Sequence, residues 1–276
     1  MKTQFPEDKF ASRGFRHAND LIMAFIGGSE LHGAKLEGTD DTDWYGVYIE
    51  PPELALGIDS DEHFVFTTGG ERGGNNPGDV DVCLYSLNKW AHLAAKGNPS
   101  VLHFMFAQPE FQTFAWAQLW MKRDAFLAKS HLNQFLGYAN AQLQRLFNQR
   151  GQKDCHRPFL EEQYGYDTKY AMHIIRLLGE AKELLETGTI TMPRPNVEEL
   201  RAIRMGKYEL NELRGWVDQL EREALAAKGK STLPEKVDRK AISRLIAAAY
   251  RNHWEWRDAH PVCESKTEAA CTHAQK

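Results

Sequence analysis

The sequence predicts an α+β protein in which an N-terminal α/β lobe with a small mixed sheet precedes a C-terminal helical lobe. Short apolar runs of strand composition, separated by turn residues, lie within the first 110 residues. Beyond about residue 111 they give way to long segments with helical periodicity. We therefore expect an α/β domain over residues 1–110, a helical domain over 111–260 and a disordered tail over 261–276.

Individual elements follow from composition and end signals. Strands are predicted at residues 21–27, 44–49 and 80–85. Helices are predicted at residues 8–19 and 86–96, the second with Ser86 as its N-cap. In the second lobe the predicted helices are Phe126–Gln149, Asp167–Glu186, Asn196–Met205, Leu210–Lys228 and Asp238–Arg257.

The composition is that of an ordinary globular protein. Of the 276 residues, 42% are hydrophobic and 26% are charged. No apolar run is long enough for a transmembrane helix, and the first ten residues carry charges where a signal peptide would be apolar. The cysteines include no CxxC pair, so neither a zinc ribbon nor a disulfide framework is indicated. We expect a cytoplasmic protein that makes no membrane contact.

The two lobes differ in charge. Residues 1–110 hold 8 Lys and Arg against 17 Asp and Glu, a net charge of −9, whereas residues 111–276 hold 26 against 21, a net charge of +5. An acidic lobe suits divalent cations, and a mildly basic lobe suits a phosphate-bearing partner. Ordinary fluctuation of charge along a chain would give the same asymmetry without either partner.

The most informative stretch begins at Gly28-Ser29 and ends at Asp41-Thr42-Asp43. A glycine at the end of a strand lets backbone N–H groups approach a phosphate closely, and Ser29 adds a hydroxyl. Alternation along the next strand puts Asp41 and Asp43 on one face, where they can bridge divalent metal ions. The combination predicts a nucleoside triphosphate held with Mg²⁺ or Mn²⁺, against the plainer interpretation of a turn followed by solvated acids.

A third carboxylate on an adjacent strand would complete a two-metal site. Asp81, in the predicted strand 80–85, is our first choice for a catalytic and metal-binding role beside Asp41 and Asp43. Asp79 has the same parity and lies two residues earlier, so it stays open as the alternative.

These residues resemble the motif of the nucleotidyltransferases of the DNA polymerase β superfamily, with residues 30–40 as the spacer between Gly-Ser and Asp-x-Asp. The resemblance narrows to the branch that is predicted to act in RNA repair and is also carried by phages, and it extends to about residue 250. The matching runs are residues 40–48 (DDTDWYGVY), 87–90 (LNKW), 97–99 (GNP) and 165–169 (GYDTK), the last leading to His173 and Arg176. The resemblance implies a nucleotidyltransferase domain that moves a nucleoside monophosphate from a triphosphate to a hydroxyl and releases pyrophosphate.

Two residues depart from the pattern of that branch. Asp40 stands where Ser is usual, and His103 stands where Glu is usual. If that Glu serves the chemistry, activity is in question, so a catalytically inert nucleic-acid-binding or toxin–antitoxin regulatory protein on the same fold is the alternative. A metal-dependent phosphohydrolase is disfavoured, because among histidines only His32 lies near the aspartates in sequence, and a loop histidine is expected to be solvated.

The helix predicted from Asp167 carries a polar band beside its apolar stripe. At about 100° per residue, one band about 80° wide holds Tyr166, Lys169, His173, Arg176 and Glu180. Such a flanking band suits a helix that lines a cleft. We expect Lys169, His173 and Arg176 to bind the triphosphate and Tyr166 to stack on its base. The alternative is a solvated flank.

Basic residues on either side of this helix favour an RNA acceptor. They are His156, Arg157, Arg194, Arg201 and Arg204. We expect them to follow an RNA backbone, although no known RNA-binding module is recognisable. The sequence leaves open the nucleotide, the acceptor and the oligomeric state.

Overall fold

The computed structural model describes Phe10, residues 14–36, Gly38, and residues 41–68, 78–148 and 157–260. The predicted disordered tail and Asp40 lie outside these ranges, as do His156 and residues 8, 9 and 11–13 of the helix predicted over residues 8–19. The described end of that segment holds a short 3-10 helix, η1 (Ala18–Asp20).

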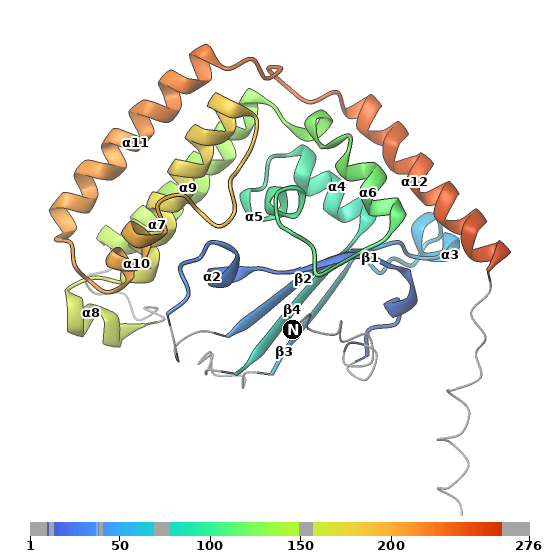
Figure 1. Cartoon of the computed structure of the whole chain (residues 1–276), viewed down its shortest axis with the longest axis horizontal. Coiled ribbons are helices and arrows are strands. Elements are labelled where there is room, and N and C mark those ends of the chain that lie inside the picture. Colours follow the sequence, from blue (N-terminus) through green and yellow to red (C-terminus); the bar gives the residue numbers. More distant parts are fainter. Residues whose placement is uncertain are drawn as a thin grey trace, which may run out of the picture.

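A small mixed sheet forms in the first part of the chain, as predicted, and it has five strands (Figure 1). Its strands lie in the order β3-β4-β2-β1-β5. Their bounds are β1 (Leu21–Ile26), β2 (Thr42–Tyr48), β3 (His63–Thr67), β4 (Val80–Ser86) and β5 (Phe111–Gln112). β2 and β4 run parallel, and the other neighbouring strands are antiparallel.

The helices of the first lobe are short, except for the one that follows β4. They are α2 (Gly28–Leu31), α3 (Pro52–Leu56), α4 (Leu87–Ala95), α5 (Pro99–Leu102), η2 (His103–Met105) and α6 (Phe114–Trp120). Ser86 caps α4 by accepting a hydrogen bond from the backbone N–H of Lys89, which confirms the predicted N-cap. Figure 1 shows α4 and α6 above one face of the sheet.

Helices of seven to 21 residues dominate the rest of the described chain. They are α7 (Leu132–Asn148), α8 (Pro158–Tyr164), α9 (Thr168–Thr187), α10 (Val197–Arg204), α11 (Leu210–Lys230) and α12 (Arg239–Ala259), with the 3-10 turns η3 (Arg123–Phe126) and η4 (Lys129–His131) before α7. α9 packs against α7, α10 and α11. None of the helices in the described ranges has both the length and the apolar character needed to cross a lipid bilayer.

One apolar core joins the sheet to the helices. It runs from Ile22 on β1 through Trp90 on α4 to Leu184 on α9 and Tyr250 on α12. Burial of such side chains stabilises a fold by about 1.5–3 kcal/mol each. The other face of the sheet carries a second cluster around Trp44. Because both faces are covered, the ends of β2 and β4 are held by packing from two sides.

The last helix returns to the first lobe. On α12, His253 and Arg257 contact the carboxylate of Asp20 at 3.1 and 3.0 Å. The hydroxyl of Tyr250 accepts from the backbone N–H of Asn88 at 3.1 Å and bonds the carboxylate of Glu50, whose pKa is raised by burial. These contacts anchor α12 against α4 and the end of β2. The proposed division of the chain at residue 110 stays a prediction.

Replacing Tyr250 by Phe is expected to lower the free energy of unfolding by about 1–3 kcal/mol, because a buried N–H and a buried carboxylate each lose a partner. Urea denaturation followed by circular dichroism measures the change. The matched control is Tyr138→Phe, which removes a hydroxyl from a side chain that is 42% exposed and should shift stability by less than about 0.5 kcal/mol. Equal stabilities of the two variants would contradict the anchoring role of Tyr250.

Candidate active site

Three carboxylates meet where β2 and β4 begin. In the parallel pairing of these strands Asp43 lies directly opposite Asp81. Asp41 precedes Asp43 by two residues, so alternation puts the two on the same face. Each of the three residues offers a carboxylate oxygen, and these oxygens all lie within 4.8 Å of one another. That spread suits a pair of divalent ions about 3.5–4 Å apart.

Asp79, the alternative third carboxylate, lies elsewhere. Its Oδ1 accepts a hydrogen bond from the Thr68 hydroxyl at 3.1 Å, and its carbonyl accepts from Thr42 N–H at 2.9 Å. It therefore joins β4 to the end of β3. The structure thus brings Asp81 together with Asp41 and Asp43, while their role in metal binding stays a prediction.

The Gly-Ser pair lies directly against this acidic group. Gly28 has a φ of +57°, in the left-handed region that favours glycine. A Cβ at this position would lie 1.8 Å from Oδ2 of Asp43. Glycine is therefore required here twice, once by backbone conformation and once by the close approach of the carboxylate. Ser29 follows and lines the same cavity.

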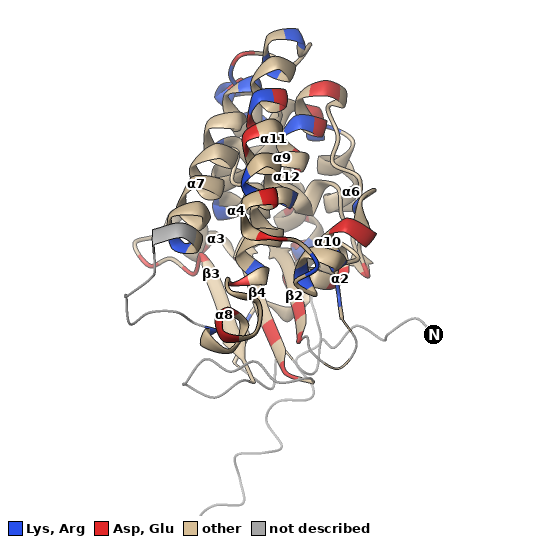
Figure 2. Cartoon of the chain, turned by 90° about the vertical axis from the view of Figure 1, so that its left-hand side faces the viewer, with Lys and Arg blue, Asp and Glu red and all other residues tan. Residues whose placement is uncertain are grey.

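A cavity of about 310 Å³ separates the acidic group from the helical lobe. The carboxylates of Asp41, Asp43 and Asp81 line one part of it. Basic and polar side chains line another part: Arg157, Lys169, His173, Arg176 and Arg204. Figure 2 shows the acidic stretches of β2 and β4 in red, seen from this side of the molecule. Opposite charges thus share one cavity of a size typical of small-ligand sites.

The basic side chains are held by partners behind the cavity wall. Arg157 donates two hydrogen bonds to Asp167, at 3.1 and 2.8 Å. Asp167 is also the N-cap of α9, because its carboxylate accepts from the backbone N–H groups of Lys169 and Tyr170. Arg204 is buried and donates to the carbonyl of Ala34 at 2.6 Å. Hydrogen bonds to the rest of the fold therefore hold Arg157 and Arg204 in the cavity wall.

The charges shift the titration of neighbouring groups. Burial, followed by the charge of Arg176, lowers the pKa of His173 to about 3. His173 is therefore neutral near pH 7. On the acidic side, burial and then the charge of Asp43 raise the pKa of Tyr45. In both groups burial is the larger cause, and the nearby charge adds to it in the same direction.

A buried cluster lies beside the cavity and was not predicted. Glu180 accepts a hydrogen bond from Arg176 at 2.7 Å and pairs with His103 Nε2 at 3.0 Å. His32 Nδ1 lies 3.5 Å from the same carboxylate. The expectation that His32 is solvated is wrong, because α2 turns its side chain toward α9 and leaves it 6% exposed. Sequence spacing gave no signal for this pairing, since the three elements are far apart in the chain.

Two further expectations need correction. Tyr166 is 4% exposed, and its hydroxyl donates to the carbonyl of Tyr208 at 2.7 Å, so it lies in the core and does not line the cavity. The cause is that α9 begins at Thr168, so helical spacing does not extend to Tyr166. Arg194 is likewise buried and pairs with Glu183, which removes it from a surface path for RNA.

Comparisons with known proteins identify one matching family model. A family model described as RlaP, RNA repair pathway DNA polymerase beta family, matches residues 6–251. A crystal structure of a nucleotidyltransferase-like protein from Exiguobacterium sibiricum 255-15 aligns at 12% identity over 93% of this chain and 79% of that chain. The TM-score of that alignment is 0.30, a value that supports no conclusion about fold or function. Curated protein sequences gave no match.

Replacing Gly28 by Ala is expected to weaken binding of Mn²⁺ or Mg²⁺ by roughly tenfold or more, equivalent to about 1.4 kcal/mol, because the added methyl group displaces the carboxylate of Asp43. Isothermal titration calorimetry measures the affinity. The matched control is Gly188→Ala, which also places Ala at a positive φ but meets only Leu233, at 3.9 Å. Equal cation affinities of these two variants would show that Asp43 contributes no ligand.

Proposed function

The chain belongs to the RNA repair pathway DNA polymerase beta family, and on this basis we propose that it transfers a nucleoside monophosphate from a nucleoside triphosphate to a hydroxyl acceptor. The observation that carries the proposal is the single cavity in which Asp41, Asp43 and Asp81 share the lining with Lys169 and Arg176. A triphosphate needs both kinds of group, carboxylates through metal ions and basic side chains directly.

The carboxylate group fits a hard divalent cation. All three donors are carboxylate oxygens, which Mg²⁺ and Mn²⁺ prefer. The absence of a Cβ at Gly28 leaves room for the carboxylate of Asp43 at its closest approach to α2. Bound by Asp41, Asp43 and Asp81, Mg²⁺ or Mn²⁺ would supply activation of the attacking hydroxyl and charge stabilisation of the phosphates.

The proposed reaction needs no nucleophilic side chain. The acceptor hydroxyl loses its proton to water and its oxygen attacks the α-phosphorus. A new P–O bond forms, the bond from the α-phosphorus to the bridging oxygen breaks, and pyrophosphate leaves. In this scheme Lys169 and Arg176 hold phosphate oxygens, and the neutral imidazole of His173 donates a hydrogen bond. Ser29 and the backbone at Gly28 meet the phosphates from the other side. The chain thereby contributes position and charge.

The acceptor that we favour is an RNA end, in keeping with the description of the family. Arg157 supports this choice, because its guanidinium lines the cavity while remaining partly exposed. The acceptor hydroxyl would then reach the carboxylates from the side of α8 and the start of α9.

The alternative of an inert nucleic-acid-binding protein rests on His103, which stands where the branch usually has Glu. His103 is paired with Glu180, so a carboxylate still lies next to this position, supplied by another helix. That observation favours the enzyme. Incubation with each labelled triphosphate, Mg²⁺ and an RNA pool, compared with gel retardation of the same RNA, separates the two functions: retardation without labelled product would identify the inert protein.

Asp43→Asn and Asp81→Asn should each reduce nucleotidyl transfer by roughly a thousandfold, because several kcal/mol of transition-state stabilisation goes with a metal ligand. Asp79→Asn, directly before the same strand, is the matched control and should retain activity, since its carboxylate bonds Thr68. Transfer of labelled nucleotide gives the rates, and circular dichroism reports folding. Loss of activity in Asp79→Asn with retention in Asp81→Asn would move the third carboxylate to Asp79.

Lys169→Ala should weaken triphosphate binding by roughly tenfold to a hundredfold, because a hydrogen bond to a charged phosphate is worth about 1.5–3 kcal/mol. Its melting temperature should change little, since a partly exposed lysine contributes little to stability. The control is Lys228→Ala, which changes a partly buried lysine on α11. It should alter neither triphosphate binding nor the melting temperature. Unchanged binding in Lys169→Ala would leave the triphosphate to the N-terminal lobe alone.

A further inference from the structure

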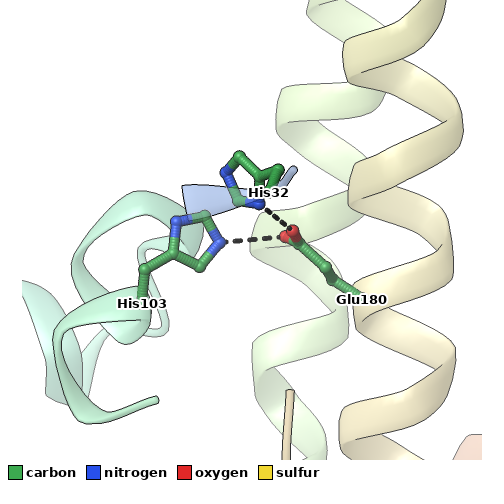
Figure 3. Close-up of side chains that lie close together, drawn as sticks. All are labelled: His32, His103 and Glu180. Atoms are coloured by element: carbon green, nitrogen blue, oxygen red, sulfur yellow. Dashed lines mark hydrogen bonds and ion pairs between the residues drawn. The ribbon is translucent and has the colours of Figure 1, made fainter. Parts of the chain in front are cut away.

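Three potential metal ligands meet in the buried cluster between the lobes. They come from the end of α2 (His32), from η2 (His103) and from α9 (Glu180), and their donor atoms all lie within 4.8 Å of one another. Their exposed fractions are 6%, 5% and 0%. Figure 3 shows both imidazole rings directed at the one carboxylate.

The spacing of the donor atoms is close to that of a coordination sphere. Zn–N and Zn–O bonds of about 2.0–2.2 Å put neighbouring ligand atoms of a tetrahedral site about 3.4 Å apart. Here Nε2 of His103 lies 3.0 Å from Oε2 of Glu180, and Nδ1 of His32 lies 3.5 Å from Oε1. Both contacts are close to the ligand–ligand distance of a tetrahedral site, with the two histidines meeting different oxygens of the one carboxylate.

His32 supplies the second observation that points to a ligand. Its Nδ1 is buried and, among the described residues, has no hydrogen-bond partner. A buried polar atom of this kind is destabilising by about 1–3 kcal/mol when it stays unsatisfied.

Arg176 holds the carboxylate from behind. It donates to Oε1 of Glu180 at 2.7 Å, whereas His103 meets Oε2. Burial alone would raise the pKa of Glu180, but the charges of Arg176 and His103 outweigh it and hold that pKa well below its usual range. Carboxylate ligands are commonly hydrogen-bonded in this way by an outer residue. With Arg176 and a dication both beside Glu180, an anionic fourth ligand would be favoured, and both histidines line the cavity from which it could enter.

We propose that His32, His103 and Glu180 form a site for a transition-metal dication, with Zn²⁺ as the ion that best suits two imidazoles and one carboxylate. His103 would carry its proton on Nδ1 when Nε2 ligates the ion. The site is separate from the Asp41 group, whose oxygen donors prefer Mg²⁺, and it does not depend on the proposed nucleotidyl transfer. Occupied, it would tie α2, which begins with the Gly-Ser pair, to α9.

The test is titration of the full chain with Zn²⁺ in the presence of excess Mg²⁺, followed by calorimetry. Wild-type protein is expected to bind one equivalent. His32→Asn and His103→Asn should each weaken binding by roughly a hundredfold or more. His92→Asn, at an exposed histidine, and Asp43→Asn, in the other acidic group, should bind Zn²⁺ like the wild type.

The visible spectrum of the Co²⁺-loaded wild type gives a second measurement that needs no variant. Four-coordinate nitrogen and oxygen ligation gives strong d–d bands, whereas octahedral ligation by carboxylates and water gives weak ones. The proposal is overturned if folded wild-type protein binds neither ion, if both histidine variants bind Zn²⁺ unchanged, or if only Asp43→Asn loses it. Binding that persists in both histidine variants would place the ion elsewhere, including residues of the C-terminal tail.

Discussion

The parallel pairing of β2 with β4 is the constraint on which the candidate active site depends. It sets Asp43 opposite Asp81, and Asp41 lies just before β2 on the same side of the sheet. A shift of one residue in this register would turn the carboxylate of Asp81 to the opposite face of the sheet. The register is fixed by packing on both faces, with Val47 in one core and Trp44 in the other. Apolar residues that never touch the cavity therefore decide whether its carboxylates meet.

A second constraint is the charge of Glu180. A carboxylate with no exposed surface is stable only when it is paired, and it is paired here with Arg176 from its own helix and with His103 from the first lobe. The pairing places the middle of α9 beside η2 and the end of α2. Lys169 and His173 lie about three and two turns earlier on the same helix, so the contact that pairs Glu180 also sets which face of α9 lines the cavity.

The sequence allowed the central strands and the long helices to be predicted, because their signals are local. The LIMAFIG and VDVCLY runs have strand composition. Ser86 and Asp167 are N-cap residues, and a helix begins directly after each of them. It did not predict β3, whose HFVFT run is short and half exposed at the sheet edge, nor β5, which has two residues. Such edge strands form because a neighbouring strand offers backbone groups for pairing. The residues of the edge strand carry no signal of that neighbour, which lies elsewhere in the sequence.

The same distinction between local and non-local signals applies to the site residues. Gly28, Ser29, Asp41 and Asp43 could be predicted from the sequence, because a turn and an alternating strand bring them together over a short stretch. Lys169, His173 and Arg176 followed from helical spacing, whereas Tyr166 did not, because the helix begins after it. The pairing of His32 and His103 with Glu180 joins positions 77 residues apart or more, and only the packing of the lobes creates it.

The cap of α9 shows how closely fold and site are joined. Asp167 is 1% exposed, and it accepts from the backbone N–H groups of Lys169 and Tyr170 while also holding the guanidinium of Arg157. The first interaction starts the helix at the residue that brings Lys169 to the cavity, and the second orients a basic side chain on the same wall. Because one buried carboxylate carries both, the start of the helix and the position of Arg157 cannot vary independently. The basic side of the cavity is therefore set by the same hydrogen bonds that define the helix.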